Sequence, residues 1–491
     1  MPCTTILVGK KASYDGSTII ARNEDCPSGE FCEKRFAVSD AAGKTTYKSV
    51  IGHREIALPQ GGGRYTCMPN ANLKEGLWEA AGVNAHNVAM TATETLTNNE
   101  RVLAADPLVV YKAAVGAPGE EGYVPEVIGG IGEEDMVTLV LPYATSARDG
   151  VLRLGALLAE HGTYEINGIA FSDADEIWWL ETVGGHHWIA RRVPDDCYVT
   201  MPNQLGLDSF DLDDALGAGA EHLCSPDLRE FIEKNHLDLS LDGRLNPRDA
   251  FGTHSDSDHV YNTPRAWDIQ RFLNPNAGPW ETAAAHEPFG PESDTLPWAR
   301  VPERKVTIED VKYALSLHYQ GTVYDPYGHI GTPATRGLYR PIGINRNCQL
   351  AVLQIRPYAD DAHRALQWIA LGSNAFNALV PFYTQVDDVP DYVRETPKKP
   401  STESFYWANR LVAAMADASY GSCLPHVERY QEKLQSRALG LVLAADEAGS
   451  DPAATNQAIA DVARETTDDL LAHVLFQRSL EMKNGFSRSD N

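Results

Sequence analysis

The sequence has few basic residues for its number of acidic ones. Its 491 residues include 42 Lys and Arg against 68 Asp and Glu, a formal charge of −26 at pH 7. Nucleic acids and anionic membranes are polyanions, so this balance opposes binding to either. Small peptides are not excluded as partners.

Long apolar segments and targeting signals are also lacking. No stretch approaches the roughly 18 uninterrupted apolar residues of a membrane-spanning helix. The start has no basic segment followed by an apolar run, the pattern of a secretion signal. With 43% hydrophobic and 22% charged residues, the composition is that of an ordinary globular protein, which we expect to be cytoplasmic.

No Cys-x-x-Cys pair is present, and the cysteines are widely scattered. This distribution predicts neither a disulfide scaffold nor a zinc knuckle, and it disfavours a thiol-redox enzyme. A resolving or metal-binding role for the two cysteines nearest the first one is a minor alternative. The eight cysteines are Cys3, Cys26, Cys32, Cys67, Cys197, Cys224, Cys348 and Cys423.

Three short motifs have the composition of binding sites but lack the full pattern. The glycines at 61–63 are not followed by the Lys-Ser/Thr of a P-loop and indicate a flexible connection. His186 and His187 are consecutive, so in a strand they face opposite sides and cannot readily share a metal ion. The segment 256–259 lacks the glycine and the terminal glutamate of a calcium loop and is expected to be a solvated loop.

The start of the chain carries the most informative residue. If the two residues before it are removed, Cys3 has both a thiol and a free α-amine. Their unperturbed pKa values, about 8.5 and about 7.7–8.0, make such a residue a nucleophile with its own general base. The alternative is that Cys3 is a small apolar residue that opens an edge strand.

A β-hairpin follows from the residues after Cys3. Residues 4–11 and 18–23 are rich in β-branched side chains and flank a Ser-Tyr-Asp-Gly-Ser turn. A turn centred there pairs Cys3 with a residue between 24 and 26, which brings Arg22 and Asp25 beside the thiol. Arginine can lower the thiol pKa, and aspartate can hold the α-ammonium; the alternative is a surface ion pair of little energetic value.

The rest of the chain changes from strands to helices. Extended segments are expected at 77–97, with a turn at 84–87, and at 168–200, 349–355 and 365–371. Helices are expected at 134–161 with a break at Pro142, at 226–235, near Asp249, and from Thr307 to His318. From residue 403 the pattern is helical, with breaks at Gly421, Pro425 and 449–452. Antiparallel sheets with interspersed helices predict an α+β layered fold.

The opening Cys-Thr-Thr-Ile-Leu-Val-Gly-Lys-Lys-Ala-Ser-Tyr-Asp-Gly-Ser-Thr-Ile-Ile-Ala-Arg-Asn-Glu-Asp, residues 3–25, resembles the start of PepD-type dipeptidases. These are cysteine peptidases of the N-terminal nucleophile (Ntn) hydrolase superfamily, with secernins as relatives and penicillin V and bile-salt acylases as distant ones. Weaker echoes follow in order: Gly-Val-Asn at 82–84, Met-Pro-Asn-Gln at 201–204, Tyr-Asn-Thr-Pro-Arg-Ala-Trp at 261–267 and Arg-Pro-Ile-Gly-Ile at 340–344.

The resemblance implies an αββα four-layer sandwich with a helical C-terminal extension. We expect a catalytic domain over 3–400 and an extension over 401–491 that packs on it. A homo-oligomer is expected, although the apolar face of the extension can equally serve packing within the chain.

The resemblance also implies site residues beyond Cys3, Arg22 and Asp25. Asn203 is the first candidate oxyanion donor, and its alternative is a turn-forming role. Arg265 suits the thiolate or a substrate carboxylate, and its alternative is a solvated helix residue. Thr93 or Glu94 stands roughly where the acylases carry an oxyanion asparagine; the Glu94 carboxylate could bind a substrate ammonium, or be solvated at a strand end.

Asn84 in the Gly-Val-Asn segment is the second candidate for substrate binding. The activity implied is hydrolysis of dipeptides of broad composition through a thioester on Cys3, without metal or organic cofactor. The alternatives are an amide hydrolase for acyl amino acids or γ-glutamyl substrates, and a non-catalytic, secernin-like interaction protein. Because Pro2 would acylate the Cys3 amine, the mechanism requires that it be removed, by self-cleavage or by another peptidase.

Overall fold

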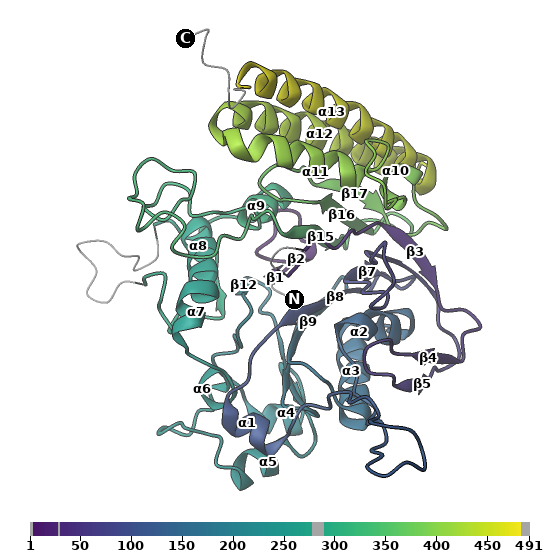
Figure 1. Cartoon of the computed structure of the whole chain (residues 1–491), viewed down its shortest axis with the longest axis vertical. Coiled ribbons are helices and arrows are strands. Elements are labelled where there is room, and N and C mark those ends of the chain that lie inside the picture. Colours follow the sequence, from purple (N-terminus) through teal and green to yellow (C-terminus); the bar gives the residue numbers. More distant parts are fainter. Residues whose placement is uncertain (1–2, 28–29, 277–288, 483–491) are drawn as a thin grey trace.

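The fold is built around two antiparallel β-sheets that lie face to face (Figure 1). The computed structural model describes residues 3–27, 30–276 and 289–482. Within these residues the first sheet has seven strands, in the order β14 (Ala299–Arg300), β12 (Tyr198–Met201), β1 (Cys3–Val8), β2 (Thr18–Asp25), β15 (Asn347–Ile355), β16 (Ala365–Leu371) and β17 (Val380–Tyr383).

The second sheet supplies the opposite wall of the interior. Its order is β13 (His222–Cys224), β11 (His187–Arg192), β10 (Ile177–Val183), β9 (Asn167–Ser172), β8 (Ala89–Thr95) and β7 (Ala81–Val83). Strands β1 and β2 contact β8 across the interface, so the start of the chain lies between the sheets. Two small ribbons pair β3 (Ala37–Asp40) with β6 (Arg64–Cys67) and β4 (Thr46–Lys48) with β5 (Glu55–Ala57).

Helices cover the outer face of each sheet. On the second sheet lie α2 (Glu133–Val140) and α3 (Ala147–His161), separated by the 3-10 turn η1 (Leu141–Tyr143) at the predicted break. On the first sheet α11 (Phe405–Ala416), α12 (Tyr420–Ala448) and α13 (Pro452–Leu480) contact β16 and β17. The predicted α+β fold with αββα layers is confirmed. The boundary between a domain at 3–400 and an extension at 401–491 stays a prediction.

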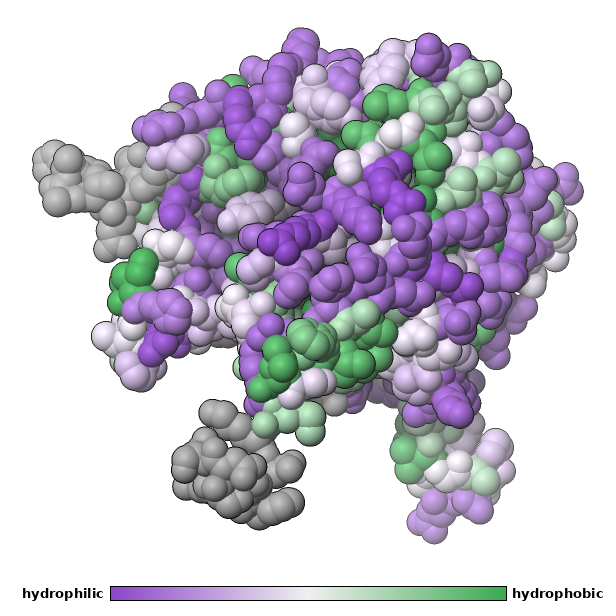
Figure 2. Space-filling view, turned by 90° about the horizontal axis from the view of Figure 1, so that it is seen from above, coloured by the Kyte–Doolittle hydropathy of each residue, from purple (hydrophilic) through white to green (hydrophobic). Residues whose placement is uncertain are grey.

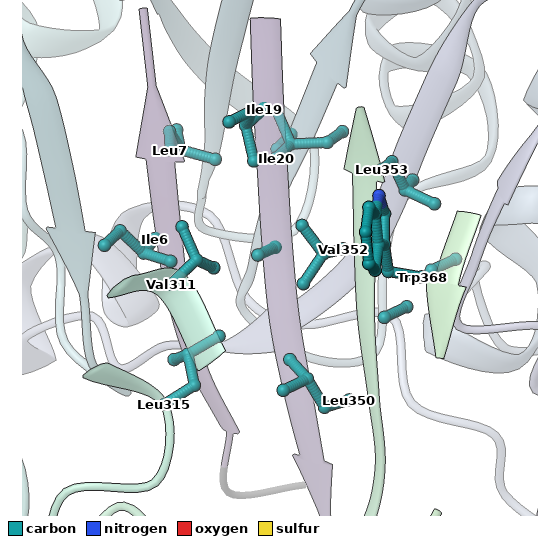
Figure 3. Packing of buried hydrophobic residues seen from close by; sticks show 14 of the residues in the cluster. Ile6, Leu7, Ile19, Ile20, Val311, Leu315, Leu350, Val352, Leu353 and Trp368 are labelled. Atoms are coloured by element: carbon teal, nitrogen blue, oxygen red, sulfur yellow. The ribbon is translucent and has the colours of Figure 1, made fainter. Parts of the chain in front are cut away.

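The core lies on both faces of the central strands, because β1, β2 and β15 are buried at every residue. Figure 3 shows Val311 and Leu315 beside Ile6 of β1, on one side of the sheet, with Val352 of β15 and Trp368 of β16 further along. All of these side chains are buried. Because apolar side chains fill most of both strand faces, the few polar residues between the sheets are held in a dry environment.

The remaining helices connect the layers, and one of them corrects a prediction. Residues 256–259 form α7 rather than a loop, because Ser255 and Asp258 make a reciprocal capping box at its start. These helices are α1 (Glu100–Ala105), α4 (Leu212–Leu216), α5 (Leu228–Lys234), α6 (Pro247–Phe251), α7 (Asp256–Tyr261), α8 (Thr263–Leu273), α9 (Ile308–Ala314) and α10 (Asp391–Arg394).

The C-terminal helices also correct two predicted breaks. Helix α12 begins at Tyr420 and runs through Gly421 and Pro425. Proline removes only one backbone hydrogen bond there, to the carbonyl of Gly421 in the first turn, so the helix tolerates it. The break at 449–452 is confirmed: Gly449 ends α12 with φ 58°, a left-handed conformation that glycine adopts readily.

The face seen from above in Figure 2 is mostly hydrophilic, with separate hydrophobic groups between charged residues. Exposed apolar residues on α12 and α13 include Leu443, Leu475, Phe476 and Leu480. Among the helices of the described residues, none combines the length and apolar character needed to cross a membrane.

Candidate active site

The opening hairpin places the Cys3 thiol between the sheets. In the antiparallel register, Cys3 pairs with Glu24 and Thr5 pairs with Arg22, which confirms the predicted pairing. Cross-strand partners and alternate residues share a face of a sheet, so these four side chains point the same way. All four are buried.

Arg22 places its guanidinium on the thiol. Its Nη1 lies 3.0 Å from Cys3 Sγ. Its Nη2 donates to the carbonyls of Ala92 at 2.9 Å and Ala80 at 3.2 Å, and Nη1 also donates to Thr93 O at 2.5 Å. Burial raises the pKa of the Cys3 thiol, and the Arg22 charge acts against this rise. The arginine is therefore a rigid cation that favours the thiolate.

Buried carboxylates balance the charge of Arg22. Glu24 Oε2 lies 3.4 Å from its Nη2, and Glu133 Oε1 lies 3.3 Å from its Nη1. Lys34 Nζ lies 2.8 Å from Glu24 Oε1. The sequence reasoning missed Glu24, Glu133 and Lys34. Glu24 had a signal, since it lies two residues from Arg22 on the same strand face, whereas Glu133 and Lys34 are brought in by other elements.

Asn203 and Arg265 hold the backbone of Cys3. The Cys3 N–H donates to Asn203 Oδ1 at 3.1 Å, and Arg265 Nη2 donates to the same oxygen at 2.7 Å. Arg265 also donates to Cys3 O, to Thr4 Oγ1 at 2.7 Å and to Tyr261 O at 2.7 Å. Burial, together with another nearby arginine, lowers the pKa of Arg265 to about 10. Its alternative role as a solvated helix residue is therefore wrong, because its fork is directed at the start of β1.

Asp25 lies at the end of β2, three residues from Arg22 and on the opposite face. It is ion-paired with Arg340 and accepts a hydrogen bond from Asn347 Nδ2. None of its hydrogen bonds within the described residues reaches Cys3. Neither Arg340 nor Asn347 was predicted from the sequence as a site residue; Arg340 begins the Arg-Pro-Ile-Gly-Ile segment and Asn347 follows it by three residues, so that segment was the available signal.

Glu94 comes to the site from β8 of the second sheet. Thr5 Oγ1 donates to its Oε2 at 2.7 Å, while Oε1 has no hydrogen-bond partner among the described residues. Burial raises the pKa of Glu94 to about 8, although Arg265 and Arg22 oppose the rise. The carboxyl is buried, so the alternative of a solvated strand-end carboxylate is wrong.

Asn84 is not brought to this group. Its Nδ2 donates to the carbonyls of Leu141 and Ala144, both at 2.7 Å, and its Oδ1 accepts the N–H groups of His86 and Val88 at 2.9 and 3.0 Å. These bonds close the turn between β7 and β8 and join it to η1. The geometry is that of a structural asparagine.

A cleft of about 710 Å³ opens beside Asn203. Arg346 is the cation among its lining residues, and it is held by Tyr261, whose hydroxyl lies 3.1 Å from Nη2. The cleft is also lined by Thr95, Leu96, Thr97, Thr253, Ser255, Ser257, Asp258 and Asn262. Asn203 therefore contacts both the cleft and the Cys3 backbone.

His186 and His187 correct the expectation that they face opposite sides. Their Nδ1 atoms lie 2.8 and 2.7 Å from the two carboxylate oxygens of Asp106. This is possible because β11 begins only at His187, directly after the glycine turn at 184–185. The burial of Asp106 acts in the opposite direction, but these hydrogen bonds lower its pKa to about 2.

Two antiparallel sheets with helices outside enclose a thiol and a guanidinium that are both buried and in contact with each other. The chain belongs to peptidase family C69, whose family model matches residues 2–433.

Similar proteins are found along the whole chain. It is 56% identical to a dipeptidase of Bifidobacterium longum, over all of both chains. It is 45% identical to dipeptidase A of Lactobacillus helveticus, over 85% of this chain and 82% of that one. Penicillin V acylase from Agrobacterium tumefaciens is a distant structural match, with TM-score 0.30, 12% identity, and coverage of 78% of this chain and 86% of the acylase.

Proposed function

We propose that Cys3, freed of the residues before it, is the nucleophile with which this C69 dipeptidase hydrolyses dipeptides of broad composition. The observation that carries the proposal is the contact of 3.0 Å between Arg22 Nη1 and Cys3 Sγ. It is supported by Asn203 and Arg265, which bind the N–H and the carbonyl of the same residue. Both ends of the nucleophilic residue are thereby positioned.

The reaction begins with transfer of the Cys3 proton to its own α-amine, directly or through water. The thiolate attacks the peptide carbonyl, and the tetrahedral oxyanion forms beside the side-chain amide of Asn203, whose Nδ2 donates to Thr95 O at 2.9 Å in the structure. The amine returns the proton to the leaving amino acid, and a thioester remains on Cys3. Water then hydrolyses the thioester.

Asn203 has a second role in this proposal. Its Oδ1 accepts the Cys3 N–H at 3.1 Å and would hold the freed amine in the same place. Asp25 is paired with Arg340 and Asn347 instead, so we assign it to fixing the end of β2. The sequence had predicted instead that Asp25 holds the α-ammonium of Cys3.

Glu94 is the proposed partner of the substrate ammonium. Its Oε1 is buried without a hydrogen-bond partner in the described part of the chain, so an ammonium there gains an ion pair and satisfies that oxygen. Arg346 in the neighbouring cleft is the proposed partner of the substrate carboxylate. A site that reads both ends of its substrate favours short peptides with free termini.

The test compares the purified protein with Cys3→Ser on free dipeptides, N-acyl amino acids and γ-glutamyl amides. We expect the active protein to begin at Cys3 by intact mass and to hydrolyse free dipeptides, and Cys3→Ser to be inactive. Activity in protein that still carries Pro2 would defeat the α-amine mechanism. Faster cleavage of acyl or γ-glutamyl amides would favour the alternative substrate class. A cytoplasmic location and a homo-oligomer also stay predictions.

A further inference from the structure

Three cysteine sulfur atoms lie close together next to Asp25 at the end of β2. Cys26 follows Asp25 at the end of β2, and Cys348 follows Asn347 at the start of β15. The Sγ atoms of Cys26, Cys348 and Cys32 all lie within 4.8 Å of one another. Cys26 and Cys348 are buried, and Cys32 is half-buried. Three segments of the chain therefore contribute sulfur to one small volume.

The structure contains one chemical state of this group. Cys26 and Cys348 form a disulfide with their Cα atoms 6.3 Å apart, and Cys32 is a free thiol. The backbone N–H of Cys32 donates to Cys26 Sγ at 2.5 Å. A backbone N–H directed at a sulfur favours the anionic form of that sulfur once the disulfide is reduced.

The surroundings of Cys32 disfavour a bare thiolate. Burial and the carboxylates of Glu24, Glu30 and Glu33 raise the pKa of the Cys32 thiol to about 12, although Lys34 opposes the rise. A bound metal ion deprotonates the thiols that coordinate it, so it reverses the penalty on the thiolate.

We propose that Cys26, Cys32 and Cys348 of the reduced protein bind one soft divalent metal ion of the Zn²⁺ type, and that disulfide and metal are alternative states of this site. Two molecules of a small thiol reduce the Cys26–Cys348 bond and leave as their own disulfide. The ion then displaces three protons from the three thiols. Either state links the end of β2 to the start of β15.

The spacing of the sulfurs fits this assignment. Zinc binds thiolate sulfur at about 2.3 Å with tetrahedral geometry, so two sulfurs on one ion lie about 3.8 Å apart. The three Sγ atoms already lie within 4.8 Å of one another, so binding requires the reduced Cys26 and Cys348 sulfurs to separate while Cys32 stays near both. Three protein ligands leave a fourth position for water or another small ligand, as in zinc sites that are not closed.

The test titrates the metal-free protein, reduced with a phosphine, with Zn²⁺ against a chromophoric chelator. We expect the wild type to bind one ion per chain, and Cys32→Ser and Cys348→Ser to bind it more than about 100-fold more weakly, since loss of a ligand exceeds loss of a supporting group. Cys197→Ser and Cys3→Ser are matched controls that should keep the wild-type affinity. The oxidised wild type should bind no ion at this site.

Two further readouts guard against loss of folding. Zn²⁺ should raise the Tm of the reduced wild type and leave that of Cys32→Ser unchanged. Substitution with Co²⁺ should give a thiolate-to-metal charge-transfer absorption in the wild type and in the two control variants, and not in Cys32→Ser. Equal affinity of reduced wild type and Cys32→Ser, or loss of the ion in Cys3→Ser, would overturn the proposal. Because no readout uses activity, the result is independent of the proposed peptidase mechanism.

Discussion

Arg22 Nη1 lies 3.0 Å from the sulfur of Cys3, and the guanidinium is held there by the backbone carbonyls of Ala80, Ala92 and Thr93. Two of these carbonyls come from β8, so the second sheet positions the cation that the first sheet carries. The thiol and its counter-charge are thus set by contact between the layers and not by the hairpin alone.

Arg22→Lys should lower kcat/KM by about 10- to 100-fold, because lysine keeps the charge but cannot bridge sulfur and carbonyls with one planar fork. The apparent pKa of Cys3, measured as the pH dependence of inactivation by iodoacetamide, should rise. Arg265→Lys is the matched control, since Arg265 contacts the Cys3 carbonyl and not its sulfur. An unchanged alkylation profile in Arg22→Lys would contradict the assignment.

Glu94→Gln should lower kcat/KM for free dipeptides by about 10- to 100-fold, the value of one charge-assisted hydrogen bond. N-acetylated dipeptides, which lack the ammonium, should be poor substrates of both proteins and show little difference between them. Asn84→Ala serves as control: we expect a lower Tm with an unchanged KM, because Asn84 bonds only to backbone around its own turn and η1. An equal fall in kcat/KM on free and N-acetylated dipeptides would contradict binding of the substrate ammonium by Glu94.

Glu94 also predicts a pH dependence of stability. With its pKa raised to about 8 in the folded protein from an ordinary value of 4.5, the folded state binds more protons than the unfolded state between these pH values. The free energy of unfolding therefore falls as pH rises through that window. Glu94→Gln removes this contribution, so its stability relative to the wild type should increase from pH 4.5 to pH 8. Urea unfolding at several pH values measures the difference.

Arg346→Leu should raise KM for free dipeptides by about 10- to 100-fold with a smaller effect on kcat, if the cleft cation binds the substrate carboxylate. Dipeptide amides, which lack the carboxylate, should bind wild type and variant alike. The measurement is a pair of steady-state series on one dipeptide and its amide. An equal rise in KM on both would show that Arg346 shapes the cleft without reading the carboxylate.

Asp106→Asn should lower the free energy of unfolding by about 1–3 kcal/mol at pH 7, because Asp106 accepts from both His186 and His187. The Asp106 pKa is lowered to about 2 from 3.8, so its contribution is present above about pH 4 and is lost as pH falls toward 2. Denaturation at pH 7 and pH 3 should show a smaller difference at the lower pH. Asp213→Asn, at an exposed helix position, is the control.

The local sequence pattern predicted most strands and helices, but not the tertiary contacts that they make. The alternation of β-branched residues in 4–11 and 18–23 gives the hairpin and its Cys3–Glu24 pairing, because strand periodicity and turn chemistry are local. The helix at 256–261 was missed because a capping box outweighed the polar composition of the segment. The breaks predicted at Gly421 and Pro425 were wrong because α12 packs on α13 and β17, and tertiary packing outweighs the low helix propensity of single residues.

By itself the sequence determined the hairpin that carries Cys3 and the guanidinium beside its thiol, because these depend on residues less than 25 positions apart. It also selected Asn203, Arg265 and Glu94 as candidates through motif order. Only the tertiary structure decided what each of them contacts. Packing of one sheet on the other buries Glu94 and raises its pKa. Helices α2 and α8 bring Glu133 to Arg22 and Arg265 to the Cys3 backbone, and the pairing of β15 with β2 places Cys348 beside Cys26 across 322 residues. Such contacts depend on the register of distant strands and on burial, which a linear pattern does not contain.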